Sequence, residues 1–258
     1  MKSKDIIKIL EEKFPIANAE EWDNVGLLVG DMNKTVKKIQ FSIDATLEAI
    51  ENAIKNNVDM IITHHPIIFK AIKSIREQEI LGKKLRKLIK NDIDLYCLHT
   101  NLDSTRNGLN DWVLKKIGIE KSKILDLNEE EDCGIGRLYT LDEKIDLYNY
   151  TKQIKEKLGI TNVRVVSKDF DRSIKKVALI NGSAMSYWRM AKSKDIDLFI
   201  TGDVAYHDAL DALENGLSIL DFGHYESENF FYELLKKDLE SLGLELIVFN
   251  DGPLFKFF

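Results

Sequence analysis

The strongest constraint on the fold is an internal repeat of strands and helices. Val36-Lys37-Lys38-Ile39 resembles Ile174-Lys175-Lys176-Val177, and at the same spacing of 138 residues Asp59–Thr63 corresponds to Asp197–Thr201 without a gap. In both copies the pattern indicates a strand, a turn, a helix and a second, buried strand. Strands that alternate with helices favour an α/β architecture with largely parallel pairing. The sequence therefore predicts two similar α/β halves.

Hydrophobic periodicity extends this alternation along the whole chain. We expect helices over residues 4–14, 47–55, 78–90, 146–158, 184–193, 205–214 and 226–241. Strands are expected over residues 25–29, 39–43, 59–63, 93–98, 163–166, 177–180, 198–201, 217–220 and 244–249. The acidic stretch at 127–132 has no apolar period, so the division between a first lobe (1–127) and a second lobe (128–258) is expected there. The last strand fits either lobe.

Composition narrows the class of protein. The 258 residues are 44% hydrophobic and 31% charged, which is typical of a soluble globular protein. The net charge of −6 disfavours nucleic-acid binding, because proteins that follow a phosphate backbone usually carry a basic excess. Two cysteines, Cys97 and Cys133, are too few for a cysteine-rich zinc site or a disulfide scaffold. They fit a reducing cytoplasm, and neither a signal-peptide core nor a membrane-spanning run is present.

The histidines follow a pattern, because each of the five comes just after an expected strand. They are His64, His65, His99, His207 and His224. The carboxyl ends of parallel strands lie along one edge of a sheet, where ligands of open α/β sheets bind. We therefore expect several of these histidines to converge, together with Asp103 and Glu228.

Histidine with carboxylate is a donor set that suits zinc, manganese, iron or cobalt. His224 and Glu228 are four residues apart, so a helix starting near His224 would place both on one side. The adjacent pair His64 and His65 cannot easily chelate one ion from an extended strand, but at a strand end it can serve two neighbouring ions. Other interpretations remain open: Glu228 as a solvated helix residue, and Asp103 as a cap of the turn that follows it.

Other catalytic templates are not matched. The chain has neither a G-x-x-x-x-G-K-[ST] phosphate loop nor a G-x-G-x-x-G motif. The stretch Asn181–Met185 passes from a strand to a helix like a nucleophile elbow, but it lacks the G-x-S-x-G spacing. Ser183 is interpreted instead as a helix N-cap.

Taken together, the motifs resemble the NGG-interacting-factor-three-like family of dinuclear-metal-centre proteins, often labelled GTP cyclohydrolase I type 2 homologues. Matching stretches run in the family's order over nearly the whole chain: Glu21-Trp22-Asp23-Asn24-Val25-Gly26-Leu27, Ile62-Thr63-His64-His65-Pro66, His99-Thr100-Asn101-Leu102-Asp103, Thr201-Gly202-Asp203 with His207, and Gly223-His224 with Glu228.

The resemblance implies two interlinked α/β lobes with mixed, largely parallel sheets, no inserted third domain, a metal site between the lobes, and a ring-shaped homohexamer, a toroid. It implies that two divalent metal ions (zinc, iron or manganese) are held by five residues, with Glu228 bridging: His64, His65, Asp103, His224 and Glu228.

Two functions follow from this resemblance. One is a metal-dependent, cyclohydrolase-like hydrolase acting on a nucleotide-like or other small substrate, with His99 as the candidate acid/base or supporting residue, or else a structural histidine. The other is a non-catalytic metal-loaded ring that binds or senses a small-molecule ligand. For either function we expect no membrane partner, and we expect a cytoplasmic protein from its cysteine content.

Overall fold

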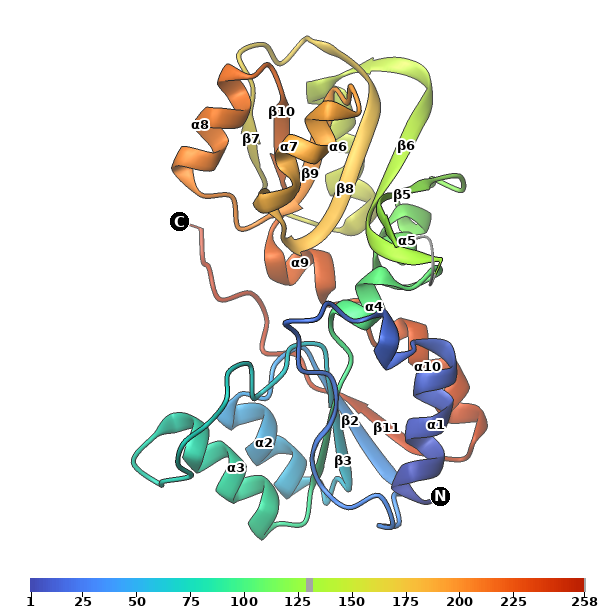
Figure 1. The fold of residues 1–258 in the computed structure, drawn as a ribbon, viewed down its shortest axis with the longest axis vertical. Helices are drawn as coiled ribbons and strands as arrows, with labels where there is room; N and C mark the ends of the chain where they lie inside the picture. The colour runs from blue at the N-terminus through green and yellow to red at the C-terminus, as the bar shows by residue number, and fades with distance from the viewer. Residues whose placement is uncertain (129–131, 258) are drawn as a thin grey trace. The chain divides into compact units, whose positions relative to one another are not determined.

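Two compact units make up the computed structural model, which describes residues 1–128 and 132–257. The first unit contains Met1–Thr105 and Phe230–Gly252, and the second contains Arg106–Asn229 and Pro253–Phe258. The chain therefore leaves the first unit, builds the second and returns, as the colours of Figure 1 show. The predicted α/β class, with two mixed sheets, is confirmed.

The division between the units comes earlier in the sequence than the stretch at 127–132 suggested. It lies between Thr105 and Arg106, so that α5 and β5 belong to the second unit. Within the acidic stretch, residues 129–131 lie outside the described residues. The last strand pairs with β2, in parallel, and so belongs to the first unit.

The first unit is a five-stranded sheet in the order β1-β4-β3-β2-β11, parallel except for the edge strand β1. Figure 1 shows α2 and α3 on one face of this sheet and α1 and α10 on the other. Its elements are α1 (Ser3–Lys13), η1 (Ile16–Asn18), β1 (Gly26–Val29), β2 (Lys38–Ser42), α2 (Leu47–Lys55), β3 (Met60–Thr63), α3 (Ile80–Lys90), β4 (Asp94–Cys97), α4 (Thr100–Ser104), α10 (Glu233–Ser241) and β11 (Glu245–Val248).

Local sequence explains how these helices start and pack. Helix α2 begins after Thr46, whose side chain accepts a hydrogen bond from the amide of Ala49 at 3.0 Å, and so caps a free backbone donor. Its buried residues Ala49, Ile50 and Ala53 lie on one helical face. That face packs in a core with Ile61 and other sheet residues, which holds α2 against the strands.

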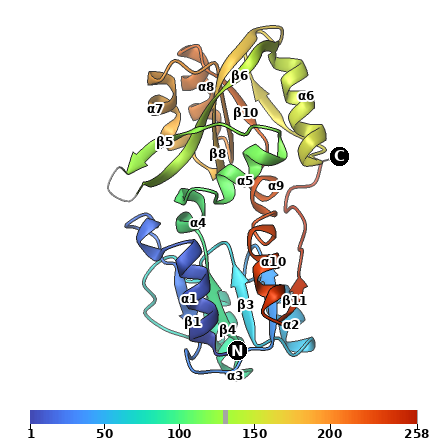
Figure 2. The same cartoon turned by 90° about the vertical axis from the view of Figure 1, so that its right-hand side faces the viewer.

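The second unit is a six-stranded sheet in the order β5-β6-β8-β9-β10-β7. Strands β8, β9 and β10 are parallel, whereas β5, β6 and β7 pair antiparallel with their neighbours. Figure 2 shows α6 on one side of this sheet and α7 and α8 on the other. Its elements are α5 (Leu109–Lys116), β5 (Lys123–Asn128), β6 (Cys133–Asp146), α6 (Leu147–Leu158), β7 (Arg164–Val166), β8 (Ser173–Ser183), η2 (Met185–Tyr187), α7 (Trp188–Ser193), β9 (Leu198–Gly202), α8 (Tyr206–Glu214), β10 (Ser218–Asp221) and α9 (His224–Glu228).

The structure confirms the internal repeat down to single hydrogen bonds. Asp59 Oδ2 accepts the amides of Lys37 and Lys38 at 2.8 and 2.9 Å. In the second unit Asp197 Oδ2 accepts the amides of Lys175 and Lys176 at the same two distances. Asp59 thus connects β3 to β2, and Asp197 connects β9 to β8. The two strand pairs have equivalent registers.

This equivalence predicts equal energetic effects in the two units. We expect Asp59→Ala and Asp197→Ala each to lower the free energy of unfolding by about 2 kcal/mol, because each removes an acceptor of two charge-assisted bonds. Urea unfolding measures both, with Asp142→Ala, an exposed carboxylate, as the control. An effect at only one of the two sites would contradict the structural equivalence.

Two features differ from the sequence-based expectations. The helix expected over 226–241 is broken into α9 and α10. The break lies where the chain passes from the second unit to the first, and it lets Phe231 pack edge-on against Phe41 with ring centres 6.0 Å apart. The antiparallel pair β5 and β6 was not predicted, because short apolar runs among charged residues resemble loops. Among the residues that the structure describes, no helix is both long and apolar enough to cross a membrane.

Candidate metal centre

In the first unit, polar side chains gather where the parallel strands end. Strand β3 ends at Thr63 and is followed by His64 and His65, and β4 ends just before His99, the residue that precedes α4. Because β2, β3 and β4 pair in parallel register, their carboxyl ends lie along one edge. His64, His65 and His99 each offer one ring nitrogen, and these three atoms lie within 4.8 Å of one another.

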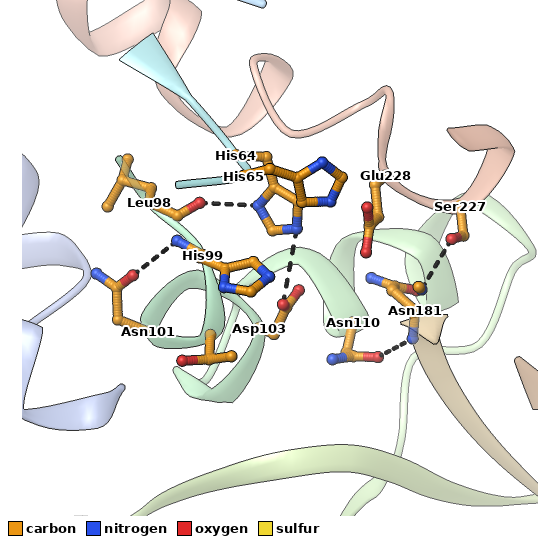
Figure 3. A network of polar contacts seen from close by, with 12 residues as sticks. His64, His65, Leu98, His99, Asn101, Asp103, Asn110, Asn181, Ser227 and Glu228 are labelled. Atoms are coloured by element: carbon orange, nitrogen blue, oxygen red, sulfur yellow. Dashed lines mark hydrogen bonds and ion pairs between the residues drawn. The ribbon is translucent and has the colours of Figure 1, made fainter. Parts of the chain in front are cut away.

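His64 is fixed by reciprocal contacts with the end of β4. Its Nδ1 lies 2.8 Å from the carbonyl oxygen of Leu98, and the Cys97 thiol donates to the carbonyl oxygen of His64 at 3.1 Å. Both residues are fully buried, and burial raises the pKa of the Cys97 thiol, which keeps it protonated. A carbonyl oxygen only accepts hydrogen bonds, so Nδ1 carries the proton of neutral His64 and Nε2 carries the lone pair. That Nε2 lies 3.7 Å from Asp103 Oδ2 on α4 (Figure 3).

Carboxylates hold the other two histidines of this cluster in the same way. His65 Nδ1 lies 3.0 Å from Asp44 Oδ1, and His99 Nδ1 lies 2.9 Å from both carboxylate oxygens of Asp23. A carboxylate that accepts a hydrogen bond from Nδ1 orients the ring and places the lone pair of the neutral imidazole on Nε2.

Asp23 is an anion held by its surroundings. Burial by itself would raise its pKa, but hydrogen bonds and the charge of His99, together with bonds from Thr100 and Asn24, lower the pKa of Asp23 to about 2. The Thr100 amide donates to it at 3.1 Å and the Asn24 amide at 2.8 Å. Asp23 therefore stays ionised at any working pH and keeps His99 in one orientation.

This lowered pKa predicts a pH-dependent contribution to stability. The carboxylate titrates near 3.8 in the unfolded chain and near 2 in the folded one, so its stabilisation is complete above the unfolded value and is lost as pH falls through 2. We expect Asp23→Asn to cost about 1–2 kcal/mol at pH 7, after allowance for solvent screening, and less at pH 3. Urea unfolding at both pH values, beside Asp142→Asn, is the measurement. A difference that did not shrink at pH 3 would exclude this cause.

The second unit carries the other part of the predicted ligand set, on one short helix. His224 and Glu228 are the first and last residues of α9, and His224 Nε2 lies 3.0 Å from Glu228 Oε2. On the other side of the ring, His224 Nδ1 lies 2.7 Å from Asp203 Oδ2, in the loop after β9. Asp203 has a backbone φ of +52°, a left-handed conformation that aspartate tolerates better than most residues. Glu228 is buried, whereas the His224 side chain is 32% exposed.

In each unit, taken by itself, the residues present include donors that fit a divalent metal ion. Each of the four histidines turns Nδ1 toward a carbonyl or carboxylate oxygen, which is the arrangement typical of metal-binding histidines. The carboxylates Asp103 and Glu228 add oxygen donors of the kind that zinc, manganese and iron accept.

Comparison with known proteins decides which family this architecture represents. Residues 1–252 match the family described as Duf34/NIF3 (NGG1p interacting factor 3). The chain belongs to this family. The match covers nearly the whole chain, so the resemblance expected from the motifs is confirmed.

Relatives within the Duf34/NIF3 family support the assignment. The chain is 42% identical over 229 residues to the GTP cyclohydrolase 1 type 2 homolog of Clostridium perfringens, covering 88% of this chain and 87% of that protein. Among solved structures it is similar to Staphylococcus aureus hypothetical protein SA1388 (TM-score 0.90, 30% identity, 100% and 99% coverage) and to reduced HcgD from Methanocaldococcus jannaschii (TM-score 0.84, 34% identity, 96% and 97% coverage).

Within this family fold, two sequence interpretations need revision. His207 lies exposed on α8 and stacks edge-on with Tyr206, with ring centres 5.3 Å apart, outside the histidine cluster. Ser183 is the last residue of β8, and Ala184 precedes η2 without a side-chain cap, so Ser183 is not an N-cap.

Asp44 is the supporting residue that sequence reasoning missed. It lies two residues after the end of β2, as His65 lies two residues after the end of β3, so the rule that located the histidines at strand ends would have found it when applied to carboxylates.

Proposed function

We propose that this Duf34/NIF3 protein is a metal-dependent hydrolase with a dinuclear centre, acting on a nucleotide-like or other small substrate. The observation that carries the proposal is the common orientation of His64, His65 and His224, each with Nδ1 at a carbonyl or carboxylate oxygen, which is typical of histidines that bind a metal through Nε2. His64, His65, Asp103, His224 and Glu228 would hold the two ions, with Glu228 bridging them. Bound divalent ions would lower the pKa of water and polarise a substrate oxygen.

The chain's own acid/base candidate is His99. Its Nδ1 is held by the ionised Asp23, and one of its ring nitrogens belongs to the cluster with His64 and His65. An Asp–His pair in this arrangement stabilises the protonated imidazole, so Nε2 can take a proton and return it. In this proposal His99 moves protons and Asp23 holds the ring in place.

The substrate class rests on the relatives' names. The curated relatives are called GTP cyclohydrolase 1 type 2 homologs, which supports purine nucleotides as the first substrates to test. We propose further that the protein works as a cytoplasmic homohexamer, which sedimentation analysis of the purified chain would test directly.

A substrate panel with matched variants tests the proposal. Protein reconstituted separately with zinc, manganese and iron would be given GTP, other purine nucleotides and simple phosphoesters. We expect metal-dependent turnover that His99→Gln lowers about 10²–10⁴-fold without loss of metal, while exposed His207→Gln changes neither. Binding of a nucleotide without turnover by any metal form would instead support a ring that senses or holds a ligand.

A further inference from the structure

A buried side-chain amide at the end of β8 lies next to helix α9 and has no hydrogen-bond partner within the part of the chain that the structure describes. Asn181 is 6% exposed, and neither its Nδ2 nor its Oδ1 has a hydrogen-bond partner among the described residues. A buried polar group without a hydrogen bond costs folding free energy, so such groups are rare and call for an explanation.

Hydrogen bonds of the neighbouring backbone N–H groups fix the position of the Asn181 side chain. The backbone N–H of Asn181 donates to Asn110 Oδ1 at 3.0 Å, and the backbone N–H of Gly182 donates to Ser227 Oγ at 3.0 Å (Figure 3). Ser227 Oγ in turn donates to the carbonyl oxygen of His224 at 2.7 Å. The end of β8 is therefore tied to α9, the helix that carries His224 and Glu228.

The Glu228 carboxylate lies close to the backbone at the end of β8. Gly182 has a φ of +62°, and a Cβ atom added there would collide with Glu228 Oε1 and lie 3.6 Å from His224 Nε2. Only glycine allows the carboxylate to come this close to the backbone. Figure 3 shows the Asn181 amide beside Glu228.

We propose that Asn181 is a positioning residue for Glu228, whose carboxylate receives a hydrogen bond from Asn181 Nδ2 when a divalent cation is bound. This inference rests on the proposed metal centre. Glu228 Oε2 lies 3.0 Å from His224 Nε2, and any hydrogen bond between these two atoms is lost when both are ligands of a cation, because metal binding displaces the proton. Ligating carboxylates are themselves usually hydrogen-bonded, and the Asn181 amide is a buried donor in the right place.

The proposal predicts effects of opposite sign on metal affinity and on stability. We expect Asn181→Leu to weaken Zn²⁺ binding about 10–100-fold in competition with a chelating dye. The same change should leave unaltered, or raise, the resistance of the chelator-stripped protein to urea, because it removes an amide that has no hydrogen bond. Asn181→Asp has nearly the same shape but no N–H donor when ionised, so its Zn²⁺ affinity should fall at least as far.

Asn215→Leu is the matched control in the same unit. Asn215 is exposed, and its Nδ2 donates to the carbonyl oxygen of Asp211 at 2.8 Å, so this variant should lose a little stability and keep its Zn²⁺ affinity. Unchanged Zn²⁺ affinity in both Asn181 variants would overturn the proposal, as would a loss of stability in the stripped Asn181→Leu protein.

The outcomes for this residue and for the enzyme are separable. Zn²⁺ binding that depends on Asn181, without turnover of any substrate, would support the positioning role and reject the hydrolase. A wild-type chain that binds no Zn²⁺ or Mn²⁺ would reject both.

Discussion

Replacing His64 with alanine is expected to remove most of the bound divalent metal from this protein. The side chain is fully buried, and its Nδ1 is bonded to the carbonyl oxygen of Leu98, so the ring is already held in the orientation that the proposed ligand role of Nε2 requires. Alanine removes that ligand. We expect about two ions per wild-type chain and fewer than one in the variant. The measurement is elemental analysis of untagged protein that has been purified without chelator and loaded separately with zinc, manganese and iron.

Two further variants make this result specific. Glu228→Ala should lower metal content as sharply, because the proposed bridge belongs to both ions. His207→Ala removes an imidazole that is exposed on α8, outside the cluster, and should retain the wild-type content. Absence of bound ions from the wild type under every loading condition would refute the dinuclear centre and leave the histidines as structural residues.

The second large effect concerns the stability of the second unit. Arg137 is 1% exposed in β6, and its guanidinium donates to both carboxylate oxygens of Asp111 on α5 at 2.7 and 2.8 Å. It also donates to the carbonyl oxygens of Gly134 and Gly136. Asp111→Ala would take away the carboxylate that accepts two hydrogen bonds from this buried guanidinium. We expect a loss of about 3–5 kcal/mol in the free energy of unfolding, measured in urea.

A double-mutant cycle separates the ion pair from general damage to the fold. Arg137→Met removes the charge but also the donor to two backbone carbonyls, so this variant should be destabilised as well. The double variant should be close to the worse single variant rather than to the sum, because the buried charge is then gone. Additive losses would show that the two side chains act independently.

Local sequence was sufficient for the parts of the fold that repeat a simple pattern. The alternation of apolar strands and amphipathic helices predicted β2, α2 and β3, and the matching segment at Asp197–Thr201 predicted their counterparts in the second unit. These elements depend on neighbours within a few tens of residues. The antiparallel pair β5 and β6 is also local, but its short apolar runs lie among charged residues and resemble loops, so its own sequence did not reveal it.

The histidines could be located from sequence for a similar reason. A residue just after a buried strand must lie at the edge of the sheet, and parallel neighbours share that edge. This placed His64, His65 and His99 together correctly. The same rule also included His207, which is exposed on α8. A position after a strand does not determine whether the side chain turns toward the sheet edge or toward solvent.

The sequence alone determined the fold class, the repeated strand pairs and the presence of histidine donors at the strand ends. Tertiary structure decided which residues support that chemistry: Asp44 behind His65, Asp23 behind His99, Asp203 behind His224, and the unpaired amide of Asn181 beside Glu228. The physical reason is distance along the chain. Periodicity records what a residue's own element buries, whereas a hydrogen bond between two loops depends on folded geometry that no local pattern contains.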